Sequence, residues 1–150
     1  PDIATVSFTV KEEGKAPASA EALVAGKVKP ILEGLKSQGI DEKDIKTMSY
    51  NSYPQYEYPS PCYGGAGVIC PASSSKTKII GYEVSENILV KVRKVDKASD
   101  VVDLLSQNKV TDISGPNFEI DNKDALESEA RKKAIDDAKS KAFAASKNNV

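Results

Sequence analysis

Alternating apolar and polar positions open the chain and predict a half-buried β-strand over residues 3–10. The apolar positions are every second residue, and the positions between them carry hydroxyl side chains. Because successive side chains of a strand point to opposite faces, this pattern turns one face toward a core. A Glu13-Gly14-Lys15 turn is expected to end the strand. The core face would consist of Ala4, Val6, Phe8 and Val10.

A helical period follows from about Pro17 to Gln38. Apolar residues recur there one helical turn apart and form a single stripe. Pro30 lies inside this segment and predicts a kink, because its ring crowds the carbonyl of the preceding turn. Gly39 predicts the end of the helix. The stripe consists of Val24, Val28, Ile31, Leu32 and Leu35.

Two extended segments, 45–58 and 79–93, predict a long β-hairpin. Pro54 marks the first segment as an edge strand or a bulge. In the second, only Glu86 interrupts the apolar face, and we expect it where the strand has left the core. Since this strand is longer than the first strand of the chain, the hairpin is expected to project from the sheet as an arm. The apolar face consists of Ile80, Tyr82, Val84, Ile88, Val90 and Val92.

The remaining pattern predicts a short helix, a fourth strand and a long last helix. Asp96 is expected to cap the short helix, and a bulge at Gly115-Pro116 to interrupt a strand over 110–120. Asp121 or Asn122 would cap the last helix, which runs to about Ser146. The order β-α-β-β-α-β-α indicates an α+β fold with an antiparallel sheet, helices packed on one face and a long protruding β-hairpin. No internal repeat or second domain is visible, so residues 1–150 are interpreted as one domain.

Composition excludes several function classes. The net charge is −1 from 21 basic and 22 acidic residues, which argues against binding to nucleic acid. The chain has no histidine, so it lacks the commonest general base and zinc ligand. No apolar run is long enough to span a bilayer. These features predict a protein that is not an enzyme and that carries no metal or other cofactor.

Cys62 and Cys70 are the two cysteines of the chain, and they flank a glycine-rich segment at the expected tip of the hairpin, within an insert at about 59–75. Their spacing favours a local disulfide, which would indicate an oxidising compartment. The alternative is a thiol-based redox enzyme that uses the same pair. Reactive thiols need a nearby cation or helix N-terminus, and no charged residue lies between these two.

The tyrosines are also concentrated on the expected arm. Packing across the hairpin and contact with a partner are equally good interpretations, because tyrosine offers a large contact area at low entropic cost. The residues concerned are Tyr50, Tyr53, Tyr56, Tyr58 and Tyr63.

An ordered set of short motifs runs along nearly the whole chain. The sequence resembles the SIMPL-domain family, whose bacterial relatives include periplasmic oxidative-stress-defence proteins and a periplasmic immunogenic protein. The matching segments are Pro1-Asp2-Ile3-Ala4, Leu35 to Ile40, Asp44-Ile45-Lys46-Thr47, Tyr56-Glu57-Tyr58, Ile80-Gly81-Tyr82, Asn87, Leu89, Val90-Lys91-Val92-Arg93, Phe118-Glu119-Ile120 and Glu129-Ala130-Arg131-Lys132-Lys133-Ala134.

The resemblance implies an exported protein, periplasmic or extracellular, that forms homo-oligomers and binds protein partners. It also implies a loosely defined role in oxidative-stress defence or signalling, with no catalytic residues to assign. Relative to the family pattern, a glycine-rich strand before the Pro-Asp motif and further chain after the last helix are missing. The chain is therefore expected to be a core fragment of a SIMPL-like domain.

Overall fold

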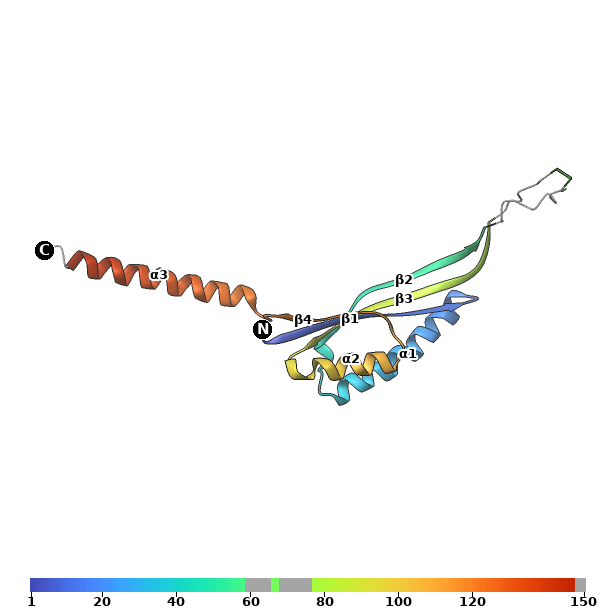
Figure 1. The fold of residues 1–150 in the computed structure, drawn as a ribbon, viewed down its shortest axis with the longest axis horizontal. Helices are drawn as coiled ribbons and strands as arrows, with labels where there is room; N and C mark the ends of the chain where they lie inside the picture. The colour runs from blue at the N-terminus through green and yellow to red at the C-terminus, as the bar shows by residue number, and fades with distance from the viewer. Residues whose placement is uncertain (59–65, 68–76, 148–150) are drawn as a thin grey trace.

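The computed structural model describes residues 1–58, 66–67 and 77–147, and Figure 1 shows the arrangement of its elements. The element order confirms the predicted β-α-β-β-α-β-α sequence and the α+β class. Short 3-10 turns, Glu42–Asp44 and Val95–Lys97, precede β2 and α2. The elements are β1 (Ile3–Gly14), α1 (Pro17–Ser37), β2 (Ile45–Glu57), β3 (Lys78–Val92), α2 (Ala98–Gln107), β4 (Thr111–Glu119) and α3 (Lys123–Lys147).

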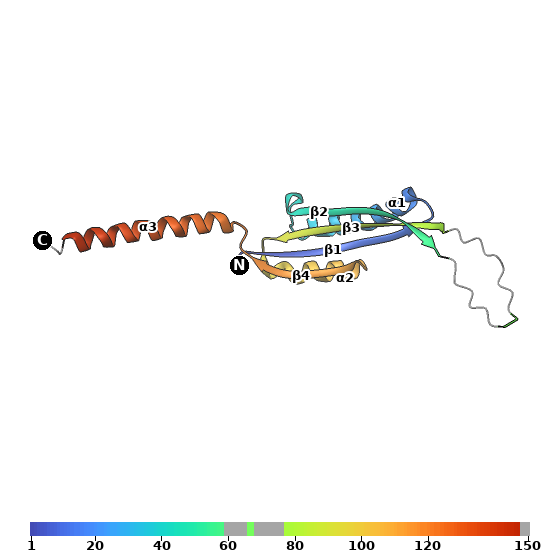
Figure 2. The ribbon, with the colours of Figure 1, turned by 90° about the horizontal axis from the view of Figure 1, so that it is seen from above.

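The four strands form one antiparallel sheet in the order β2-β3-β1-β4. Strand β3 lies between β1 and β2, which is the split βαβ arrangement that the element order predicted. Helices α1 and α2 lie on the same face of this sheet, while α3 projects from one end (Figures 1 and 2). The opposite end of the molecule is the turn side of the β2–β3 hairpin.

The core lies between this sheet face and the two helices. The predicted alternation of β1 is confirmed, because its core-face residues are at most 2% exposed. Each pairs with β3, as in Val6 with Val90 and Phe8 with Ile88. Burial of this apolar surface is the main source of stability. The helices contribute Val24, Val28, Ile31 and Leu35 from α1, and Ala98, Val101 and Leu105 from α2.

Helix α1 ends where the sequence predicted. Gly39 has φ +83°, a conformation that glycine adopts without the strain of a side chain. The Gly39 N–H donates to the Lys36 carbonyl at 3.0 Å, and the Ile40 N–H donates to the Leu35 carbonyl at 3.1 Å. This pair of hydrogen bonds is the Schellman motif. It turns the chain toward the start of β2.

The predicted turn at Glu13-Gly14-Lys15 is wrong in its first two residues, because β1 continues to Gly14. Glu12 lies on the core face opposite Val84 and forms an ion pair with Lys27 of α1. Strand β1 therefore pairs with β3 as far as Tyr82. The arm is shorter than predicted. We define the hairpin arm as Gln55–Glu57 of β2 with Lys78–Gly81 of β3, the part of the paired strands that extends beyond β1.

Three local predictions for the second half of the chain have different outcomes. Asp96 does not cap α2, because the helix is entered through the 3-10 turn and its N-cap position, Lys97, makes no side-chain capping bond. The bulge in β4 is confirmed by shifts in its register with β1, and Gly115 has φ +111° there. Asn122 caps α3, since its side-chain oxygen accepts from the Ala125 N–H at 3.4 Å.

We predict opposite effects for two glycine-to-alanine substitutions. At Gly14, a Cβ would lie 2.7 Å from the backbone nitrogen of Ala20, so Gly14→Ala should lower the free energy of unfolding by ~1–3 kcal/mol. At Gly26, inside α1, a Cβ would meet nothing within 4 Å, so Gly26→Ala should raise it by ~0.5–1 kcal/mol. Urea denaturation measures both. A Gly14→Ala variant as stable as the parent would contradict the close packing of β1 against the start of α1.

Candidate functional site

A network of ion pairs joins the ends of several elements at the α3 side of the sheet. Arg93, directly after β3, donates from Nε and Nη2 to the two carboxylate oxygens of Asp44, each at 2.8 Å. Its Nη1 donates to Asp121 at 2.6 Å. The Asp44 side chain is 5% exposed, so the guanidinium supplies the partner that a buried carboxylate requires. Asp44 and Arg93 both belong to motifs that carry the family resemblance.

Asp121 extends this network to the N-terminal strand and to α3. Its carboxylate also accepts from Lys91, and its N–H donates to Asp2 at 2.9 Å. Hydrogen bonds from Lys91 and then Arg93 lower the pKa of Asp121, and the bonds to Asp44 and Asp121 raise the pKa of Arg93. Every charge here has a partner, so the network positions the start of α3 rather than supplying a reactive group.

The sequence interpretation missed this network because its members are far apart along the chain. No local pattern links Asp44, Arg93 and Asp121. The available signal was the presence of Asp44 and Arg93 in separate motifs of one family.

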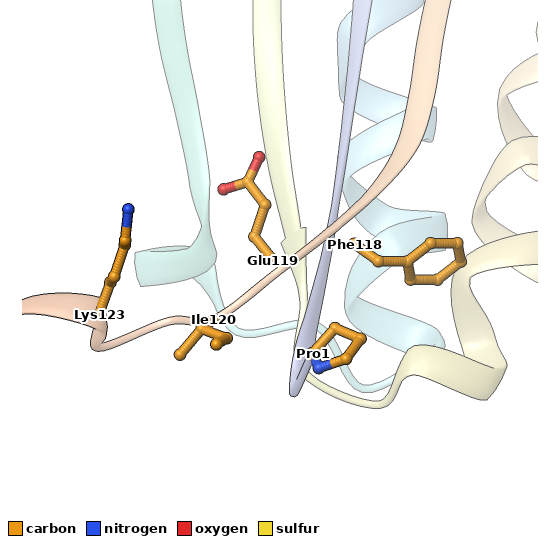
Figure 3. Close-up of a pocket in the computed structure, with 5 residues that line it drawn as sticks. All are labelled: Pro1, Phe118, Glu119, Ile120 and Lys123. Carbon is orange, nitrogen blue, oxygen red and sulfur yellow. The ribbon is translucent and has the colours of Figure 1, made fainter. Parts of the chain in front are cut away.

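An apolar hollow lies beside the network, between the first residue and the end of β4 (Figure 3). Its volume is about 490 Å³, and its apolar lining comes from Pro1, Phe118 and Ile120. Phe118 and Ile120 are 54% and 46% exposed. Glu119 points away from them in Figure 3, and its carboxylate accepts from the Thr5 hydroxyl at 3.3 Å. The hollow offers apolar contact and no catalytic constellation.

The described tyrosines of the predicted partner surface are divided between the two faces of the sheet. Tyr50 pairs with Glu86, which places it on the helix side. Tyr53 pairs with Glu83, which places it on the opposite face. Tyr56 pairs with Ile79 after a register shift between Gln55 and Tyr56, so this pairing does not assign it to the face of Tyr53. The ring of Tyr58 lies 6.5 Å from that of Tyr56, and it is 73% exposed.

Cys62, Cys70 and Tyr63 lie outside the residues that the structure describes. Their predicted disulfide and partner contact therefore stay predictions. Over residues 1–58, 66–67 and 77–147, no three acidic, cysteine or histidine side chains gather in a way that could hold a metal ion.

Glu86 is not where the sequence interpretation placed it. The strand has not left the core at this point, because Val84 and Ile88, the neighbours of Glu86 on the same face, are 0% and 2% exposed. Glu86 itself is half-buried, and one of its carboxylate oxygens accepts from the Thr47 hydroxyl at 2.9 Å.

Comparison with known proteins agrees with the resemblance seen in the motifs. The sequence profile of SIMPL, described as a protein of unknown function (DUF541), matches residues 1–149. The chain is 29% identical over 147 residues to the 26 kDa periplasmic immunogenic protein of Brucella melitensis. The aligned region covers 95% of the chain and 53% of that protein.

Two further relatives carry the name uncharacterized protein YggE. The protein from Edwardsiella ictaluri is 27% identical over 142 residues, covering 95% of the chain and 54% of the relative. The protein from Escherichia coli K12 is 26% identical over 138 residues, covering 92% of the chain and 50% of the relative. The chain thus spans about half the length of the curated relatives it matches. Among its described helices, none is long and apolar enough to cross a membrane.

The network predicts a specific pH dependence of stability. Because the pKa of Asp121 is lowered below its ordinary value of 3.8, its ionised form stabilises the fold above about pH 4, and this contribution is lost as the pH falls further. Asp121→Asn should therefore lower Tm near neutral pH, and its difference from the parent should shrink as the pH falls below about 4. Thermal unfolding followed by circular dichroism measures this.

The matched control is Asp124→Asn, which removes a nearby charge that forms no ion pair in the described part of the chain. That variant should show little change at any pH. A difference in Tm between Asp121→Asn and the parent that stays constant from neutral to acidic pH would contradict the assigned role of Asp121.

Proposed function

The chain belongs to the SIMPL family, and on that premise we propose that it is a non-enzymatic, exported protein that assembles with further copies of itself and binds protein partners. The periplasmic name of the Brucella relative supports the compartment. The names of these relatives describe no enzymatic activity. The observation that carries the proposal is α3, a helix of 25 residues that stands off the body of the molecule (Figure 1).

Helix α3 has no buried residue along its length. Leu126, Ile135 and Phe143 are 49%, 50% and 63% exposed. An isolated helix is only marginally stable in water, and most helices in proteins are stabilised by tertiary packing. Three ion pairs within the helix, between side chains that are all more than half exposed, add only ~0.3–0.5 kcal/mol each. A partner that packs along α3 would supply the missing stabilisation.

The charges of α3 fit a second copy of the same helix, antiparallel to the first. Ala134 is the midpoint of a stripe made of four alanines and one leucine. If a two-fold axis passed through Ala134, each stripe residue of one helix would lie opposite a stripe residue of the other. Glu127 and Lys141 are equally far from Ala134, as are Arg131 and Asp137. A two-fold axis at Ala134 therefore places acidic against basic residues at both flanks of the contact. The stripe consists of Leu126, Ala130, Ala134, Ala138 and Ala142.

Exchanging two charges on one flank tests this contact. Glu127→Lys combined with Arg131→Glu keeps the net charge but sets like charges against Lys141 and Asp137 of the second copy. The assembly should dissociate about tenfold or more readily, because each like-charge contact costs free energy where an ion pair stood. Light scattering over a range of protein concentrations measures the mass of the assembly. It is applied to the purified chain and to the full-length protein.

The experiment contains its own rescue and control. Adding Asp137→Arg and Lys141→Glu restores opposite charges across the axis and should restore the mass of the assembly. Glu129→Lys with Lys132→Glu makes the same exchange on the far side of the helix and should leave the mass unchanged. A parent chain that is monomeric throughout, or an assembly indifferent to all these exchanges, would reject α3 as the contact.

The hairpin arm and the tyrosines on either side of it in the sequence form a second candidate contact region. Tyr53, Tyr56 and Tyr58 are 55%, 44% and 73% exposed, and Ile79 beside Tyr56 is 45% exposed. Exposed strand edges and aromatic side chains favour association with a partner. We therefore retain these three tyrosines as proposed contacts, while Tyr50 faces α1 and does not belong to this surface. The stress-defence role implied by the family stays a hypothesis.

The cysteine pair separates this proposal from the alternative of a thiol-based redox enzyme. In an aerobically prepared sample, we predict that reduction raises the intact mass by two hydrogen atoms, as expected for a Cys62–Cys70 disulfide. Thiol labelling without reductant should then be negligible. Quantitative labelling of both cysteines would contradict the disulfide and favour the redox alternative.

A further inference from the structure

Glu86 is a carboxylate on the face of the sheet that otherwise forms the core. Glu86 belongs to β3, and it lies opposite Val10 of β1 on one side and Tyr50 of β2 on the other. Its Oε1 accepts from Thr47, and among the described residues it forms no ion pair. Placing a charged carboxylate beside buried apolar side chains is costly unless a partner compensates. Thr47 supplies one hydrogen bond, and a cationic ligand would supply a charged partner.

A groove between α1 and the β2 edge of the sheet opens onto this carboxylate. Two adjoining cavities of about 150 and 370 Å³ share Val28, Leu32, Lys36 and Glu86 as lining residues. Val28 is 8% exposed and Ile88 is 2% exposed, so the floor of the groove is apolar. We call this feature the Glu86 groove. Binding sites for small molecules commonly combine such an apolar lining with a few polar groups that fix orientation.

The lining of the two cavities contains three carboxylates, Glu33, Glu42 and Glu86, and two lysines, Lys29 and Lys36. Tyr50 is 48% exposed and sits next to Glu86 in the register of β2 with β3. Burial, followed by the charges of Glu21 and Glu86, raises the pKa of the Tyr50 hydroxyl. Two carboxylates thus lie near the Tyr50 hydroxyl, beside the two cavities rather than in their lining.

The lysines at the rim do not neutralise Glu86 in this structure. Lys36 forms an ion pair with Glu42 at 3.6 Å instead. Lys29 lines the wider cavity, and it makes no ion pair with Glu86 in the described part of the chain. The half-buried carboxylate is therefore available to a ligand.

We propose that the Glu86 groove binds a small organic cation, a primary ammonium group on a short apolar chain. The ammonium group donates to the Glu86 carboxylate, and the chain lies on Val28 and Leu32. Charge complementarity supplies orientation, and burial of the chain supplies affinity. All these residues belong to one chain, so the site is complete without the assembly proposed above.

Titration with n-hexylamine, followed by calorimetry and by NMR of the backbone amides, tests the site. The parent chain should bind hexylammonium with amide shifts confined to α1, β2 and β3 around the groove. Hexanol has the same carbon chain without the charge, and hexanoate has the opposite charge. Both should bind about tenfold more weakly or not at all, because neither pairs with the carboxylate.

Glu86→Gln removes the charge but keeps an oxygen for Thr47, and it should weaken hexylammonium binding about tenfold. Glu83→Gln is the matched control, because Glu83 lies on the opposite face and pairs with Lys11 at 3.2 Å. It should leave binding unchanged. Equal affinity for hexanol, binding that survives Glu86→Gln, or no binding to the parent chain would each overturn the proposal.

Discussion

The alternating apolar face shared by β1 and β3 is the constraint on which the structure depends. These are the two central strands, and each core-face residue of one lies opposite a core-face position of the other. A shift of a single residue would turn the whole face to solvent, so the register is strongly specified. Helices α1 and α2 bury that face. The edge strands and α3 add comparatively little, since every residue of β4 and α3 is at least partly exposed.

This distribution separates the stable part of the molecule from the parts available for contact. The ion-pair network around Arg93 joins the two, because it fixes the start of α3 to the ends of β1 and β3. Removing Arg93 would leave Asp44 buried without its charged partner, which is costly. The projecting helix and the hairpin arm thus extend from a rigid body in opposite directions (Figure 2). That geometry suits a subunit that contacts others at both ends.

Regular periodicity made most of the fold predictable from the sequence, and two of the errors occur where a charged residue occupies a core-face position. The sequence interpretation ended β1 too early because Glu12 is a charged residue on the core face. Its ion pair with Lys27 takes the place of the apolar contact that the alternation would otherwise show. Glu86 was assigned to a solvated part of the strand because it, too, is a charged residue among apolar ones. Asp96 has the side chain of a helix cap, but the preceding 3-10 turn moves the cap position to Lys97. The network around Arg93 depends on tertiary contacts alone, which no local pattern encodes.

The central claim is that α3 packs against no other element in the described part of its own chain and gains a partner from a second copy. Hydrogen exchange of the α3 amides as a function of protein concentration tests it most directly, because protection reports local stability. The account predicts fast exchange along Lys123–Lys147 at low concentration and slow exchange at high concentration, with β1 and β3 protected throughout. Protection of α3 that is strong and independent of concentration would show that the helix packs within its own chain and would contradict the account.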